Sequence, residues 1–145
     1  MSFVAEASRV LPVSAEAAFD RLADHASWAR WMPRSFRPSG ASIGTLRERA
    51  KLRIRLLGMP LPVSIQVSVV RRPHEIGWRG GVPGLFLGDH RFLFEPNGPS
   101  EVRVRSVETW SGVLASLFQR KIRRDAEQVG RDQLEGLAGS FTAGA

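Results

Sequence analysis

The feature that most limits the possible folds is a change of hydrophobic period along the chain. Between residues 45 and 110, apolar side chains recur at every second position in five successive stretches, which is typical of strands with one dry and one wet face. Between residues 113 and 137 they recur at every third or fourth position over about seven turns of helix. Five strands before one long amphipathic helix predict an α+β domain whose curved antiparallel sheet wraps that helix.

The residues before these strands predict a first strand over 3–11 and then two short helices. Ser14 stands where an N-cap belongs, ahead of a helix that ends near Ala23. Asp24 can cap a second helix carrying two tryptophans, which Pro33 ends because the residue before a proline avoids helical angles. We expect one domain over residues 1–138 and a flexible tail over residues 139–145.

Composition excludes several classes of protein. None of the 145 residues is cysteine, which removes thiolate nucleophiles, iron–sulfur clusters and cysteine zinc sites. The formal net charge is +7, and all but two of the 21 basic residues are arginines. No signal peptide or membrane-spanning stretch is visible, so we expect a cytoplasmic protein.

Several site motifs are absent or lack their context. The G-x-S-x-G match at residues 40–44 follows Pro38 and precedes an alternating strand, not the strand-to-helix elbow that a serine hydrolase needs. The three histidines lack ligand spacing, and no phosphate-binding loop is present, so neither a metal nor a cofactor is expected. The arginine stripe at residues 47–55 has no aromatic side chains on its own face, which disfavours nucleic acid but leaves weak contact with an anionic membrane open.

Two polar residues share strand faces with apolar neighbours. His90 alternates with Phe92 and Phe94, and Glu108 alternates with Trp110. A hairpin at Asn97-Gly98 places His90 opposite either Ser106 or Glu108, within reach of the carboxylate in both registers. A contact between the two can be a structural pair. Alternatively, Glu108 raises the pKa of His90 and the two act as acid and base.

Several short segments together resemble a known family, the polyketide cyclase/dehydrase and lipid transport superfamily, also called START-related or SRPBCC. The resemblance spans roughly residues 3–137. It is carried, in this order, by Val10–Phe19, Trp31-Met32-Pro33, Trp78-Arg79-Gly80, Gly88–Phe94 and Glu108–Gly112. It implies the helix-grip fold and a deep apolar cavity between the sheet and the long helix, but no single function, because this fold hosts many.

Large side chains or a small apolar ligand must fill the space between sheet and helix. The candidate ligand-binding residues are Trp78, Phe92, Phe94, Trp110, Phe86, Leu85, Phe118, Leu52, Ile54 and Val67. The apolar loop at residues 82–87 is a gate over the cavity, a dimer contact or a segment packed on the helix. Glu48 is expected at the cavity mouth, where it meets either Arg79, in a rim ion pair, or water.

Three functions are consistent with these residues. The first is binding or transport of a small hydrophobic, lipid- or polyketide-like ligand in the cavity. The second is a polyketide cyclase or dehydratase in which His90 and Glu108 are the catalytic acid–base pair, without metal or nucleotide cofactor. The third is a non-catalytic structural or partner-binding domain whose interior is filled by side chains. The oligomeric state is not determined by the sequence.

Overall fold

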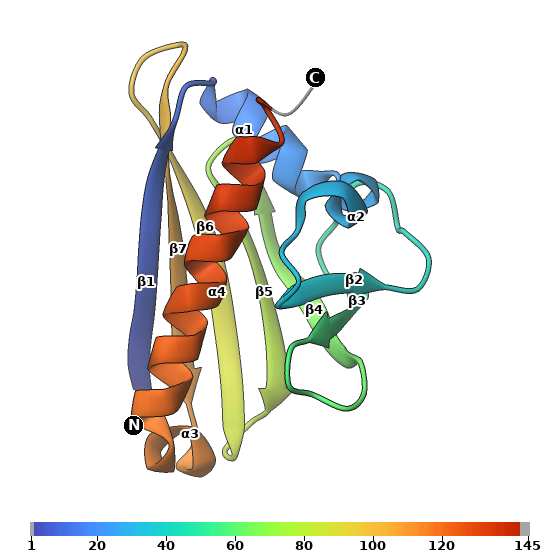
Figure 1. Ribbon diagram of the computed structural model, residues 1–145, viewed down its shortest axis with the longest axis vertical. Helices are drawn as coiled ribbons and strands as arrows, with labels where there is room; N and C mark the ends of the chain where they lie inside the picture. Colours follow the sequence, from blue (N-terminus) through green and yellow to red (C-terminus); the bar gives the residue numbers. More distant parts are fainter. Residues whose placement is uncertain (1, 143–145) are drawn as a thin grey trace.

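The computed structural model describes residues 2–142, which form a curved antiparallel sheet with helices on its inner side (Figure 1). The strand order is β1-β7-β6-β5-β4-β3-β2. The helix-grip fold expected from the sequence is therefore confirmed. The strands are β1 (Ser2–Leu11), β2 (Phe36–Ser39), β3 (Lys51–Leu56), β4 (Val63–Arg71), β5 (Glu75–Val82), β6 (Phe86–Pro96) and β7 (Val102–Ser111).

The short helices after β1 form as expected, with one correction at the second cap. In α1 (Ala15–Ala23) the Ser14 hydroxyl accepts a hydrogen bond of 3.0 Å from the amide of Ala17. The Asp24 side chain makes no such bond to the next helix. The backbone carbonyl of Asp24 instead accepts from the Ser27 hydroxyl at 2.7 Å, and a 3-10 turn, η1 (His25–Ser27), leads into α2 (Trp28–Trp31).

The strand expected from residue 45 starts only at Lys51. Arg49 has a φ of 72°, in the left-handed region, so the chain turns where the alternating pattern predicts extended backbone. Before this turn, the amide of Leu46 donates to the carbonyl of Ala23 at 2.7 Å. The alternation over residues 45–50 therefore reflects a loop packed beneath α1. The sequence also missed β2, a short edge strand that contains Pro38.

The long C-terminal helix is divided in two at Phe118. The first part is α3 (Val113–Leu117) and the second is α4 (Gln119–Gly139). Phe118 has φ −107° and ψ 28°, outside helical geometry. The amides of Val113 and Leu114 donate to the carbonyls of Gly84 and Leu85, so α3 is attached to the β5–β6 turn while α4 packs across β1 and β7. None of the helices in residues 2–142 combines the length and hydropathy needed to cross a bilayer.

Close packing of α4 on the sheet depends on Gly130. A Cβ at this position would lie 3.0 Å from the Ser106 hydroxyl oxygen and 3.5 Å from the Ala7 side chain. At the C-terminal end of α4, the Arg21 guanidinium lies 4.2 Å from the centre of the Phe141 ring and donates to the carbonyl of Ser140 at 2.7 Å. These two residues, assigned to a flexible tail from the sequence, are packed against α1. Residues 143–145 of that tail lie outside the described residues.

Candidate functional site

His90 and Glu108 project from β6 and β7 toward the inner side of the sheet. The observed register places Phe94 opposite Val104 and His90 opposite Glu108, which is one of the two registers expected from the hairpin. The turn between the strands spans residues 97–101; the amide of Asn97 donates to the carbonyl of Glu101 at 2.9 Å, and Gly98 has a φ of 85°.

The His90 imidazole is engaged by Ser106 and not by Glu108. Its Nε2 lies 2.7 Å from the Ser106 hydroxyl oxygen, and the residue is buried. The rings of Trp78 and Phe92 pack against it, with centroids 5.3 and 4.4 Å from the imidazole and 5.4 Å from each other. Burial lowers the pKa of His90 to about 3, and the opposing charge effect of Asp89 is smaller. The alternative in which Glu108 raises the pKa of His90 is therefore wrong, and with a pKa of about 3 His90 is neutral at physiological pH.

Glu108 has the opposite character. Its side chain is half-buried and lies beside Ala5 of β1, its partner across the strand pair. Burial raises its pKa to about 7, and no charged side chain among the described residues shifts that pKa. The indole N–H of Trp110 lowers it slightly, but that indole nitrogen makes no hydrogen bond that meets normal geometry. Glu108 is therefore a carboxyl on the inner face of the sheet that retains partial solvent access and has a raised pKa.

Most of the predicted ligand-binding residues are packed together in the core. The Trp78 ring lies 5.7 Å from that of Phe36 and 5.4 Å from those of Trp28 and Phe92. These aromatic rings fill the interior beneath α1 and α2, so at this end the alternative of a side-chain-filled space holds. The predicted ligand-binding residues in this buried set, each at most 3% exposed, are Trp78, Phe92, Phe94, Leu52, Ile54 and Val67.

The remaining predicted residues lie at the opposite end of the sheet. Trp110 is half-buried on the inner face, against Gly88, where an added Cβ would lie 3.0 Å from the indole ring. Leu85, Phe86 and Phe118 are exposed, at 41, 37 and 55%. The structure therefore separates the ten candidates into a filled core and a more open end, where Trp110 and Glu108 lie two residues apart on β7.

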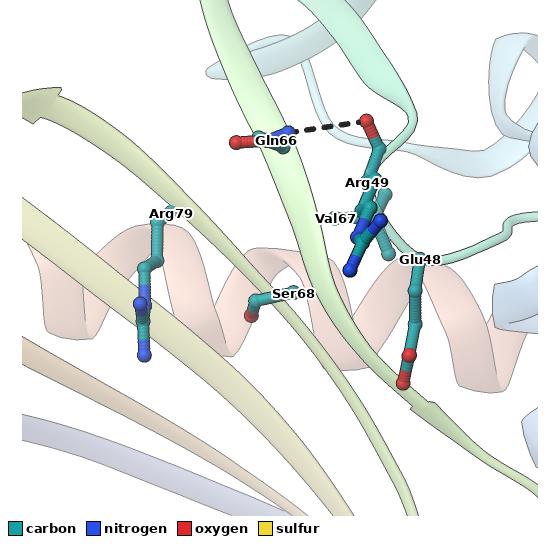
Figure 2. A pocket seen from close by; sticks show the side chains of 6 residues that line it. All are labelled: Glu48, Arg49, Gln66, Val67, Ser68 and Arg79. Atoms are coloured by element: carbon teal, nitrogen blue, oxygen red, sulfur yellow. Dashed lines mark hydrogen bonds between the residues drawn. The ribbon is translucent and has the colours of Figure 1, made fainter.

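A hollow of about 450 Å³ lies on the outer side of the sheet beside β4, with α4 behind the strands in the view of Figure 2. Ser68 lies between Arg79 and Arg49 in this view. The rim ion pair expected between Glu48 and Arg79 does not form. Glu48 Oε2 accepts from the amide of Val70 at 3.1 Å, and Arg79 pairs with Asp89 at 2.8 Å. The hollow is lined by Glu48, Arg49, Gln66, Val67, Ser68 and Arg79.

Two polar residues on the inner side of the sheet were not identified as site candidates from the sequence. Ser106 was assigned only as a register partner, but its hydroxyl is the hydrogen-bond partner of His90. Gln133 lies on α4, is 1% exposed, and neither atom of its amide group has a hydrogen-bond partner within the described chain. The signal for Gln133 was present, because it interrupts the apolar stripe of the helix between Val129 and Leu137.

The fold and this inner face define a class of protein in which a sheet grips a long helix and polar groups line the space between them. The chain belongs to the family described as polyketide cyclase/dehydrase and lipid transport, whose model matches residues 2–141. Membership in this family supports a role in ligand binding or cyclisation, with small hydrophobic molecules as the ligands. No curated protein sequence matches the chain closely enough to count as a relative.

Solved structures share the fold at low sequence identity. A protein from Thermus thermophilus superposes with a TM-score of 0.75 at 14% identity, covering 99% of this chain and 100% of that one. The Zhui aromatase/cyclase from Streptomyces sp. R1128 gives 0.72 at 11% identity, covering 97% and 93%. Norcoclaurine synthase from Thalictrum flavum, in complex with dopamine and hydroxybenzaldehyde, gives 0.71 at 12% identity, covering 100% and 89%.

Proposed function

We propose that the protein binds a small, mainly apolar ligand at the inner end of the sheet between β7 and α4, with one polar group of the ligand at Glu108. The observation that carries this proposal is the state of Glu108. A half-buried carboxyl with a pKa of about 7 and no charged partner can donate or accept a hydrogen bond near neutral pH. A ligand carbonyl or hydroxyl group would satisfy it.

Other groups on the same inner surface support a ligand with mixed character. The Trp110 indole N–H is buried without a hydrogen-bond partner among residues 2–142, which is costly unless another group pairs with it. Phe3 and Ala5 supply apolar surface on the adjoining strand. A ring system with one or two oxygen substituents matches this combination, and the similar fold of norcoclaurine synthase holds dopamine and hydroxybenzaldehyde.

The test is a titration with the fluorescent apolar probe 1-anilinonaphthalene-8-sulfonate, followed by competition with hydroxybenzaldehyde. We expect the folded wild-type protein to bind one probe molecule and the variant Trp110→Ala to bind it at least about tenfold more weakly, because an apolar side chain of the proposed site is removed. The control Leu57→Ser changes an exposed side chain on the β3–β4 turn, 79% accessible, and should bind like the wild type. Equal binding by Trp110→Ala would contradict the proposal and favour the structural or partner-binding function.

The alternative function, a cyclase or dehydratase, is favoured by the same pKa. A general acid–base group works best when its pKa lies near the working pH, and Glu108 at about 7 meets this condition whereas His90 at about 3 does not. In this reading Glu108 moves the proton, while His90, held by Ser106, shapes the site. With a polyketide-like substrate, Glu108→Gln should abolish turnover without loss of binding. Turnover that survives in this variant would exclude the catalytic role.

A further inference from the structure

One end of the molecule carries an exposed apolar surface built from two segments far apart in the sequence. The turn between β5 and β6 and the helix α3 lie together at the bottom of Figure 1. The amide of Val113 donates to the carbonyl of Gly84 at 3.1 Å, and the amide of Leu114 donates to that of Leu85 at 2.9 Å. We call this surface the apolar end; its exposed side chains are Val82, Leu85, Phe86, Val113, Leu114, Leu117 and Phe118.

The exposure of these side chains is unusual for a folded protein. Val113 and Leu117 are 70 and 72% accessible, and Phe118 is 55% accessible. No charged residue occurs in residues 80–88 or 109–119. A contiguous, uncharged apolar surface of this kind marks an interaction site. An open hollow of about 650 Å³ lies within it, lined by Gly84, Ser111, Gly112, Val113 and Ser116.

Cationic side chains begin directly beside this surface. The first turns of α4 carry Arg120, Lys121, Arg123 and Arg124 against a single acid, Asp125. Lys121 and Arg124 share Asp125 as an ion-pair partner, at 2.6 and 3.9 Å, and their side chains remain 68 and 77% exposed, so this one carboxylate leaves the first turns of α4 with an excess of positive charge. An apolar helix tip followed at once by exposed arginine and lysine is the pattern of a segment that lies in the interface of an anionic bilayer.

The positive charge at the start of α4 also distinguishes between two partners that could cover the apolar end, a second copy of the chain and a lipid membrane. If two copies met through their apolar ends, the cationic first turns of both α4 helices would approach each other and repel. An anionic lipid surface instead attracts these cations while its acyl region accepts Leu117 and Phe118. We propose that the apolar end docks on membranes that contain anionic phospholipid, with α3 in the interface. This proposal rests on the outer surface alone and is independent of the function proposed for Glu108.

The experiment is co-sedimentation of the full chain with vesicles of phosphatidylcholine, with and without about one-third phosphatidylserine. We expect binding only to the anionic vesicles, and its loss at about 0.5 M salt, where charges are screened within a few ångströms. The double variant Leu117→Ser and Phe118→Ser should bind at least about tenfold more weakly, because the inserted side chains are lost. The variant Lys121→Gln and Arg124→Gln should bind more weakly to a similar degree.

A matched control lies on the β3–β4 turn, where Leu57 and Leu61 are 79 and 71% exposed. The double variant Leu57→Ser and Leu61→Ser should sediment like the wild type, and all variants should keep the wild-type melting temperature. Three results would overturn the proposal. These are no sedimentation of the wild type, equal loss in the control variant, or a wild-type dimer in analytical ultracentrifugation that Leu117→Ser dissociates, which would make a second copy the occupant.

Discussion

His90 and Glu108 occupy opposite positions on adjacent strands, yet burial moves their pKa values in opposite directions. Loss of water disfavours the charged form of each group, so the imidazole becomes a weaker base and the carboxyl a weaker acid. Both groups are consequently neutral through part of the range between pH 3 and 7. The pair is not an ion pair, and the hydrogen bond to Ser106 supplies the partner that His90 needs.

The raised pKa of Glu108 leads to a prediction about how the stability of the protein depends on pH. The folded pKa of about 7 lies above the ordinary value of 4.5, so the folded protein binds an extra proton between these values. The wild-type free energy of unfolding should therefore decrease as the pH rises from 4.5 through 7, because the folded state gives up this proton. The Gln side chain does not ionise, so Glu108→Gln should not show this decrease. Above neutral pH the variant should be more stable than the wild type by up to about 3 kcal/mol, and near pH 5 the difference should be much smaller.

Urea denaturation of both proteins at about pH 5 and about pH 8 measures this difference. Comparing the two proteins cancels the contribution of His90, whose lowered pKa acts in the other direction: its stabilisation is present above pH 6.5 and is lost toward pH 3. Glu135→Gln, which changes an exposed carboxyl on α4, is the control and should show no such change with pH. A constant difference between wild type and Glu108→Gln would contradict a buried carboxyl.

At the level of elements, the attachment of α3 to the β5–β6 turn depends on Gly112. This residue has a φ of 109°, and an added Cβ would lie 2.9 Å from the amide nitrogen of Phe86 and closer still to the carbonyl of Leu85. Gly112→Ala should destabilise the protein by about 3 kcal/mol or more and release α3, because both the backbone angles and the close contact are violated.

The variant Gly98→Ala separates the cost of the backbone angles from the cost of the close contact. Gly98 also has a positive φ, 85°, but no atom lies within 4 Å of an added Cβ. This variant should therefore cost only about 1 kcal/mol, the strain of the left-handed angles. Chemical denaturation gives both values, and hydrogen exchange of the Val113 and Leu114 amides reports the release of α3. Equal costs for the two variants would show that the contact with Leu85 does not matter.

Strand pairing and chain breaks differ in how well sequence patterns predict them. Alternation and the Asn97-Gly98 turn predicted that β6 and β7 pair and limited the register to two possibilities, of which the structure has the one that places His90 opposite Glu108. The break at Phe118 was not predicted; the short helix α3 before it is attached through the amides of Val113 and Leu114 to carbonyls about 30 residues earlier in the chain, a contact that local periodicity does not contain. The turn at Arg49 was missed for a similar reason: its amide is held by the carbonyl of Val67 on β4.

At the scale of the whole molecule, the sequence assigned His90, Glu108 and the aromatic residues of the strands to one face of the sheet, but it did not show that the two ends of this face differ. Period two assigns Trp78, Phe92 and Trp110 to the inner side alike. Only the packing of α1 and α2 shows that the first two are enclosed by other aromatic rings and that Trp110 is not. The direction of the His90 ring toward Ser106 is a rotamer choice, which one-dimensional patterns do not contain.

This division predicts unequal responses to truncation at the two ends. Phe92 is 1% exposed and surrounded by Trp78 and His90, so Phe92→Ala should cost about 3 to 5 kcal/mol through the cavity it leaves. Trp110→Ala removes a larger side chain that is only half-buried, so it should cost less than Phe92→Ala despite its size. Guanidinium denaturation measures both. A Trp110→Ala cost equal to or above that of Phe92→Ala would mean that side chains fill the whole interior, including the end where Trp110 lies.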